Sequence, residues 1–167
     1  MHPWSTLRNL AARLGAPVAR ALRVPSISAT ATRQAYIAVV NVTDDLDFFV
    51  LEAYCLLTLK NKAPIDTSVT VAGFEVLPFV AKFDSALLEE GRRWSRITAK
   101  NSLDLKGGKT LDAVVMARVH IREKPVDGWP KKAEGKLQLA ETYDTKITAV
   151  SLPLEFSEDR QVTNISF

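Results

Sequence analysis

One segment constrains the fold of this chain more than any other. Residues 48–59 read FFVLEAYCLLTL, an apolar run that contains one charged side chain, Glu52. Acidic residues precede the run, and lysines followed by Pro64 close it, which favours a helix from 44 to 61. Such a helix is apolar on nearly every side, so it must be covered on both faces. The run falls well short of the roughly 20 apolar residues that cross a bilayer, so we do not expect a membrane span.

The composition describes one ordinary globular domain with a tail. The chain has 167 residues, of which 47% are hydrophobic and 25% are charged, so wholesale disorder is excluded. One cysteine and two histidines leave no partner for an intramolecular disulfide and too few soft ligands for most metal sites. We therefore expect no catalytic residue, no cofactor and no metal.

The first 34 residues differ in composition from the rest. They are rich in Arg, Ser, Thr and Ala and contain no acidic side chain. On a helix, Trp4, Leu7 and Leu14 fall on one side and the arginines on the other. This composition is typical of mitochondrial targeting segments, which bind anionic membranes and are drawn toward a negative interior. We therefore divide the chain into a targeting leader or docking arm, 1–34, and a single domain, 35–167.

The charge distribution argues against a nucleic-acid-binding body. Five of the 22 basic residues precede the first acidic residue, Asp44. The remaining 17 basic and 19 acidic side chains give the rest of the chain a net charge of −2. A protein that coats nucleic acid needs a cationic field to neutralise phosphates, so nucleic acid is not expected as a partner.

The remaining segments predict one more helix and several strands. Asp84 can cap a helix from 85 to 99, with its inward stripe at Leu87, Trp94 and Ile97. Together the elements predict an α+β fold, an antiparallel or mixed sheet of about five to six strands with two helices on one face, behind an amphipathic N-terminal segment. Alternating or β-branched patterns predict the strands, which are 36–42, 67–76, 110–122, 136–142, 146–156 and 162–167.

The segments that resemble reactive motifs have simpler explanations. Residues 106–110, KGGKT, resemble the end of a phosphate-binding loop, but Leu103 stands where that motif needs a glycine, so a glycine turn is predicted. Cys55 lies within the apolar run, where a thiol behaves as a small buried hydrophobe rather than a nucleophile.

Several residues are candidates for binding a partner. The second predicted helix carries a cationic edge of three arginines, for which salt bridges to nearby glutamates or to a neighbouring subunit are the simpler role. Trp129 lies in a Gly-Trp-Pro loop, where it either anchors a partner or caps its own core. The predicted partner-binding residues are Trp4, Leu7, Leu14, Phe48, Phe49, Arg92, Arg93, Arg96 and Trp129.

These features predict a structural role in mitochondria. We expect a non-catalytic accessory subunit of a large mitochondrial assembly, a respiratory-chain complex or ATP synthase, in the matrix or on the matrix face of the inner membrane. Its partners would be other protein subunits, with peripheral contact to inner-membrane lipid. The alternatives are a mitochondrial ribosomal protein, or a small matrix enzyme or carrier that binds an acidic metabolite or acyl chain through Arg118, His120 and Arg122.

Overall fold

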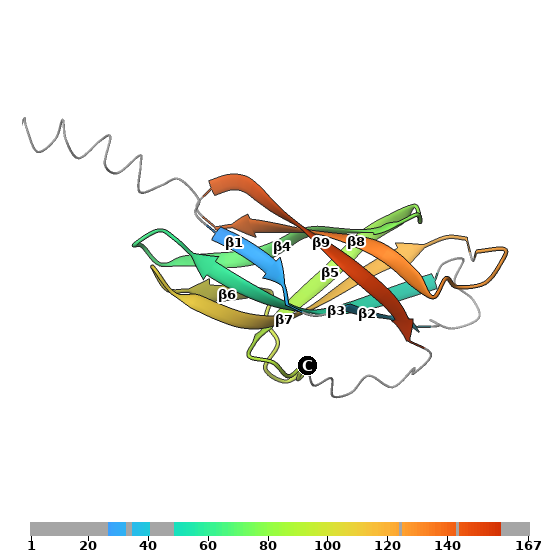
Figure 1. Ribbon diagram of the computed structural model, residues 1–167, viewed down its shortest axis with the longest axis horizontal. Helices are drawn as coiled ribbons and strands as arrows, with labels where there is room; N and C mark the ends of the chain where they lie inside the picture. Colours follow the sequence, from blue (N-terminus) through green and yellow to red (C-terminus); the bar gives the residue numbers. More distant parts are fainter. Residues whose placement is uncertain (1–26, 33–34, 41–48, 124, 143, 158–167) are drawn as a thin grey trace, which may run out of the picture.

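The fold is built from β-strands. The computed structural model describes residues 27–32, 35–40, 49–123, 125–142 and 144–157, and within these ranges no helix occurs, hence none able to span a bilayer. Figure 1 shows an elongated arrangement of long, twisted strands. The strands are β1 (Ile27–Ala31), β2 (Ala35–Val40), β3 (Phe49–Asn61), β4 (Thr67–Leu77), β5 (Ala81–Glu90), β6 (Ser102–Leu105), β7 (Thr110–Ile121), β8 (Lys132–Glu141) and β9 (Asp144–Ser157).

The strands form one sheet that folds over on itself. Its order is β5-β7-β3-β2-β9-β8-β4-β6, and β1 pairs with β3 alongside the part that β2 leaves open. Every pairing is antiparallel except that of β2 with β9, which is parallel and joins the two halves of the sheet. One half therefore consists of β1, β2, β3, β7 and β5, and the other of β9, β8, β4 and β6.

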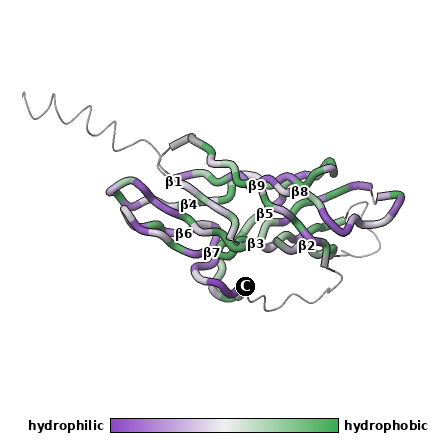
Figure 2. The backbone as a smooth tube through the Cα atoms, viewed as in Figure 1, coloured by the Kyte–Doolittle hydropathy of each residue, from purple (hydrophilic) through white to green (hydrophobic). Residues whose placement is uncertain are grey.

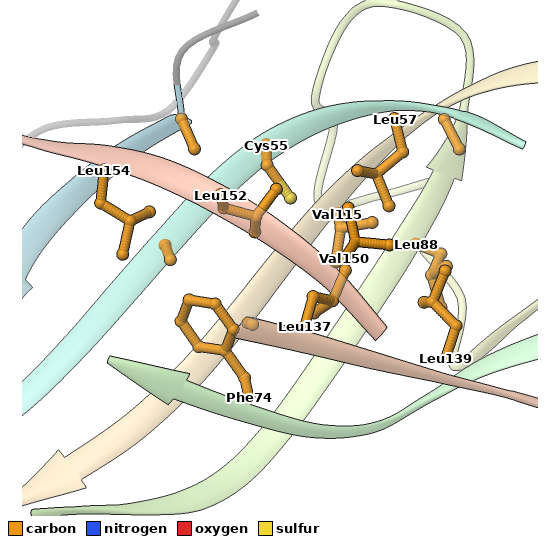
Figure 3. Packing of buried hydrophobic residues seen from close by; sticks show 14 of the residues in the cluster. Cys55, Leu57, Phe74, Leu88, Val115, Leu137, Leu139, Val150, Leu152 and Leu154 are labelled. Atoms are coloured by element: carbon orange, nitrogen blue, oxygen red, sulfur yellow. The ribbon is translucent and has the colours of Figure 1, made fainter. Parts of the chain in front are cut away.

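The hydrophobic core fills the space between the two halves. Buried leucines, valines and alanines from both halves form one continuous cluster. Figure 2 shows hydrophobic stretches along the strands and hydrophilic ones at many turns, as expected when strands are the buried elements. Figure 3 shows side chains from both halves pointing toward one another, among them Cys55, Leu57, Leu88 and Val115 from one half and Phe74, Leu137, Leu139, Val150, Leu152 and Leu154 from the other.

The predicted helix 44–61 is wrong: its described part is the central strand β3. Alternate side chains such as Leu57 point into the main core, whereas Tyr54 and Leu56 lie on the opposite face in a second buried cluster. Because both faces are covered, the strand is apolar without alternation, and its 13 residues exceed the usual length of a strand. These two properties together made it look like a helix.

The predicted helix 85–99 is also wrong. Its first half belongs to β5, which ends before Gly91, a residue with a φ of 108°. Its second half belongs to a long connection, residues 91–101, that we call the covering loop. Trp94 of this loop is buried but Ile97 is 94% exposed, so the predicted inward stripe does not exist. The predicted α+β fold of about five to six strands with two helices is therefore wrong, because the described residues form a nine-stranded, all-β fold.

Several predicted strands are confirmed. The segments 36–42, 67–76 and 110–122 correspond to β2, β4 and β7. The segments 136–142 and 146–156 correspond to β8 and β9, which form a hairpin. Ala113, Val115 and Val119 of β7, which alternate along the strand, face the main core. The predicted strand 162–167 lies outside the described residues. Residues 27–31, within the segment assigned to the leader, form β1.

The KGGKT segment forms the predicted glycine turn, and here both glycines are needed. A Cβ on Gly107 would lie 2.2 Å from the carbonyl oxygen of Pro64, and Gly108 has a φ of 67°. Asp66 accepts hydrogen bonds from the Gly107 amide, at 2.9 Å, and from Lys106 Nζ, at 2.7 Å. The turn therefore holds the start of β7 against the connection between β3 and β4.

Replacing the first glycine tests this close approach. Gly107→Ala should lower the free energy of unfolding by about 1–3 kcal/mol, because its Cβ meets backbone that cannot move independently. The exposed Lys109→Ala should change it by less than about 0.5 kcal/mol. Urea unfolding followed by circular dichroism measures both, and equal midpoints for Gly107→Ala and the unmodified chain would contradict the account.

Candidate functional site

The covering loop lies across the outer face of β3 and β7 and is anchored by Trp94. The Trp94 indole meets the ring of Tyr54 edge to face, with 5.8 Å between centroids. Leu56, Val114 and Met116 complete the buried cluster beneath it. An aromatic side chain of this size buries a large apolar area and sets a defined geometry, so the loop has a fixed position without regular secondary structure.

A carboxylate lies beside this cluster, and cationic groups surround it. Glu52 faces Arg118 across the β3–β7 pair and forms an ion pair with its guanidinium group. Arg96 of the covering loop places Nη2 3.9 Å from the other carboxylate oxygen. Because the Glu52 side chain is only 5% exposed, these charges compensate for the loss of water around it.

Tyr54 completes the network around the carboxylate. Its hydroxyl donates a hydrogen bond to Glu52 Oε2 at 2.9 Å. Burial, followed by the negative charge of Glu52, raises the pKa of Tyr54 to about 12. The hydroxyl therefore stays protonated at neutral pH and acts as a donor rather than as a base.

A second set of contacts fixes the start of the covering loop. Arg92 Nε lies 2.9 Å from Asp112 Oδ2, and Thr58 Oγ1 donates to the other oxygen of Asp112 at 2.7 Å. The amide of Gly91 donates to the Asp112 carbonyl at 2.8 Å. The hydroxyl of Thr58 and then the guanidinium of Arg92 lower the pKa of the Asp112 carboxyl. Asp112 therefore stays ionised and holds the loop at neutral pH.

The solvent side of the covering loop carries three arginines and one exposed apolar side chain. The side chains of Arg92 and Arg96 remain 61% and 64% exposed despite their ion pairs, and Arg93 is exposed as well. Ile97 follows Arg96 directly and is 94% exposed. The loop itself contains no acidic residue, although the Glu89 carboxylate of β5 accepts hydrogen bonds from the Ser95 amide and the Thr98 hydroxyl. We call Arg92, Arg93, Arg96 and Ile97 the cationic loop surface.

The three predicted arginines lie on one loop rather than on a helix, and the ion-pair partners of Arg92 and Arg96 stand six residues apart along the β3–β7 pair. Their neighbours Glu52 and Trp94, which fix the loop, were not predicted as functional residues. The sequence carried one signal for Glu52: a lone carboxylate in an apolar run must have a cationic partner. Nothing in the sequence located that partner on the covering loop.

Trp129 caps its own core. Its ring meets Phe49 and Phe79 edge to face, with centroids at 5.7 and 5.9 Å, and stacks on Phe156 at 5.9 Å. Of the two roles considered for Trp129, the geometry fits the cap, and Phe49 belongs to the same aromatic cluster. The predicted partner-binding residues Trp4, Leu7, Leu14 and Phe48 lie outside the described residues.

A cleft opens beside this aromatic cluster, between the β4–β5 turn and the segment that follows β7. It has a volume of about 760 Å³. His120 and Arg122, two of the three residues considered for an acidic ligand, line it, but Arg118 does not, because Arg118 pairs with Glu52. Of the three residues considered for an acidic ligand, Arg118 therefore belongs to a structural ion pair, whereas His120 and Arg122 line the cleft.

Cys55 is unsuited to nucleophilic chemistry. Its side chain lies in the main core, and burial raises the pKa of the thiol to about 12. The reactive form of cysteine is the thiolate, which is scarce at neutral pH when the pKa is this high. Across the described part of the chain, no group of three or more His, Cys, Asp or Glu side chains is placed to hold a metal ion.

Comparisons with known proteins give remote structural likenesses. No protein family matches this sequence, and no curated protein is similar to it. A FixG-related protein from Vibrio parahaemolyticus has a TM-score of 0.38 and 11% identity, over 75% of this chain and 99% of that one. The N-terminal domain of PorA has a TM-score of 0.35 and 9% identity over 78% and 97% of the two chains.

A third likeness is to the CooA pilin subunit from enterotoxigenic Escherichia coli. Its TM-score is 0.30 and its identity 9%, over 80% of this chain and 99% of the pilin. The matched structures are mostly proteins other than enzymes, of which this pilin subunit is one. At TM-scores below 0.5, these likenesses carry no argument about function.

The Asp112 contact predicts a specific response to acid. A carboxyl whose pKa is lowered by folding stabilises the fold above its unfolded pKa, ordinarily 3.8, and this contribution is lost as the pH falls through the lower folded value. Unfolding by urea between pH 5 and pH 2.5 should therefore show a smaller loss of stability below pH 4 for Asp112→Asn than for the unmodified chain. Identical pH profiles would show that the carboxyl does not hold the loop.

The burial of Cys55 predicts that its thiol is protected. A thiol-specific aromatic disulfide reagent should leave the folded chain unmodified at pH 8. In about 6 M guanidinium chloride, which unfolds an ordinary domain, the reagent should react with one thiol per chain. Release of the coloured thiolate measures the reaction. Rapid labelling of the native chain would contradict the position of Cys55 in the core.

Proposed function

We propose that this chain is a non-catalytic subunit of a larger protein assembly, and that the cationic loop surface binds an acidic patch on a neighbouring subunit. The observation that carries the proposal is the exposure of Ile97 on a loop that also carries three exposed arginines and that Trp94 and Glu52 hold in place. Arginine and apolar side chains are enriched at the centre of protein interfaces, and lysine is depleted there.

The rigidity of the loop supports this role. A surface that is ordered before binding loses less conformational entropy on association than a flexible one. Arg92 and Arg96 are already oriented by Asp112 and Glu52, yet most of each side chain remains open to solvent. Arg93 and Ile97 add a charge and an apolar contact that the fold itself does not use. An acidic patch with an apolar centre has the complementary chemistry.

We further propose a mitochondrial location, in the matrix or on the matrix face of the inner membrane, in a respiratory-chain complex or ATP synthase. This part rests on the composition of the leader, residues 1–34, alone. The apolar run 48–59 adds no support for a partner, because β3 is covered on both faces within the fold. If the leader is processed, a cut before Ile27 would preserve β1 and its pairing with β3.

Native-size analysis of the tagged full-length chain tests the proposal. The chain would be expressed in cells of its source organism, and mitochondria would be purified and gently solubilised. We expect protease-protected chain that runs on native gels far above its own mass of 18.4 kDa. Arg93→Glu combined with Ile97→Asp should shift the chain to low mass, because the change reverses a charge and removes the apolar contact.

A matched variant separates binding from general damage. Lys132→Glu combined with Ile147→Asp makes the same chemical changes at exposed positions of β8 and β9, and it should leave the high-mass species intact. Migration of the unmodified chain as a monomer, or equal loss of assembly in both variants, would refute the role of the loop. Recovery outside mitochondria would refute the location, and dispersal by nuclease would favour the ribosomal alternative.

A further inference from the structure

We propose that the cleft beside the aromatic cluster binds an amphipathic monocarboxylate of the fatty-acid class, with its carboxylate at Lys82 and Arg122 and its chain against Phe79 and Val80. This ligand site lies apart from the cationic loop surface and does not depend on the proposed assembly. The cleft is lined by Pro78, Phe79, Val80, Ala81, Lys82, His120, Ile121, Arg122, Glu123, Pro125 and Val126.

The strand register places the basic groups on one side of the cleft. Lys82 of β5 stands opposite His120 of β7, so their side chains lie on the same face of the sheet. Arg122 follows His120 by two residues and lies just beyond the end of β7. Lys82 and Arg122 are exposed, so both side chains can turn toward a ligand. Arginine and lysine are the side chains that best bind a carboxylate.

The acidic groups near the cleft set the charge of the ligand. Glu123 lines the same cleft, and Asp84 lies 3.9 Å from Nε2 of His120. Among the described residues that line the cleft, the permanently charged side chains are Lys82, Arg122 and Glu123, which sum to a single positive charge. A monoanion balances this charge, whereas a dianion such as phosphate would be left with excess negative charge beside Glu123.

The apolar side of the cleft fits a hydrocarbon chain. Val80 and Val126 line the cleft and are 96% and 101% exposed, so the described part of the chain covers neither of them. Phe79 forms part of the wall and rests on Trp129 behind it. A ligand chain that covered these residues would remove apolar surface from water. The volume of about 760 Å³ lies within the range of small-molecule sites.

Titration of the purified full-length chain with octanoate tests the proposal. Isothermal titration calorimetry would compare octanoate with 1-octanol, octylamine and inorganic phosphate. We expect saturable binding of octanoate, weaker binding of octanol, and none of the other two. In a two-dimensional NMR spectrum, the indole N–H signal of Trp129, assigned with Trp129→Phe, should move on addition of octanoate, because its neighbour Phe79 lines the cleft.

Paired variants distinguish the cleft from a general charge effect. Lys82→Gln combined with Arg122→Gln should raise the dissociation constant for octanoate on the order of tenfold, because two charge-assisted contacts are lost. Lys131→Gln combined with Lys132→Gln removes the same charge outside the cleft and should leave the constant within about twofold. Val80→Asn should weaken octanoate binding through the chain rather than the head group, because it removes apolar surface without adding a charge.

Three results would overturn the proposal. They are the absence of saturable octanoate binding, binding of octanol as tight as that of octanoate, and equal effects of the two charge-removing pairs. A folded spectrum of each variant by circular dichroism ensures that lost binding reports on the cleft. Since the chain is tested alone, any of these results leaves the proposed assembly role unaffected.

Discussion

The burial of β3 on both faces is the constraint on which the rest of the structure depends. One face of β3 contributes to the core between the two halves of the sheet, a role shared by every long strand. The other face would expose Tyr54 and Leu56 to water if nothing covered it. Trp94 supplies this cover, and with it the covering loop gains a fixed path across the outside of the sheet. A requirement of the core thus determines the position of a surface loop.

The charges of the loop follow from the same arrangement. Because β3 is central and buried, its one carboxylate can stay ionised only if cations reach it, and Arg118 and Arg96 do so from β7 and from the loop. Each arginine serves two roles, since its charge compensates a carboxylate of the sheet while much of its side chain faces solvent. A binding surface that is built on such contacts is ordered before any partner arrives. The contacts that stabilise the loop therefore also orient its arginines toward solvent, and this is the physical basis of the proposed interface.

The sequence predicted those strands in which apolar and polar residues alternate. In β7 the polar residues Asp112, Arg118 and His120 mark the outer face near both ends, so the strand and its inner face are identifiable although Val114 and Met116 are buried beneath the covering loop. The glycine turn before β7 is recognisable from its residues. The same logic fails for β3, because a strand covered on both sides has no alternation. It also fails for residues 85–99, where the end of a strand and an anchored loop together imitate a helical stripe. Both errors arise from one long-range contact, that of Trp94 with β3, which the order of residues does not encode locally.

The candidate sites were predictable to a similar extent. Arg92, Arg93 and Arg96 are close in sequence, so their common surface could be foreseen whatever the local structure. Lys82 and Arg122 are distant in sequence, and only the pairing of β5 with β7 brings them together. The grouping of His120 with Arg118 was misleading for a related reason: the two share a face of β7, but Glu52 on the neighbouring strand binds one of them. In a sheet, the neighbouring strand therefore decides which charges remain available for a ligand, and function becomes readable only once the strand order is known.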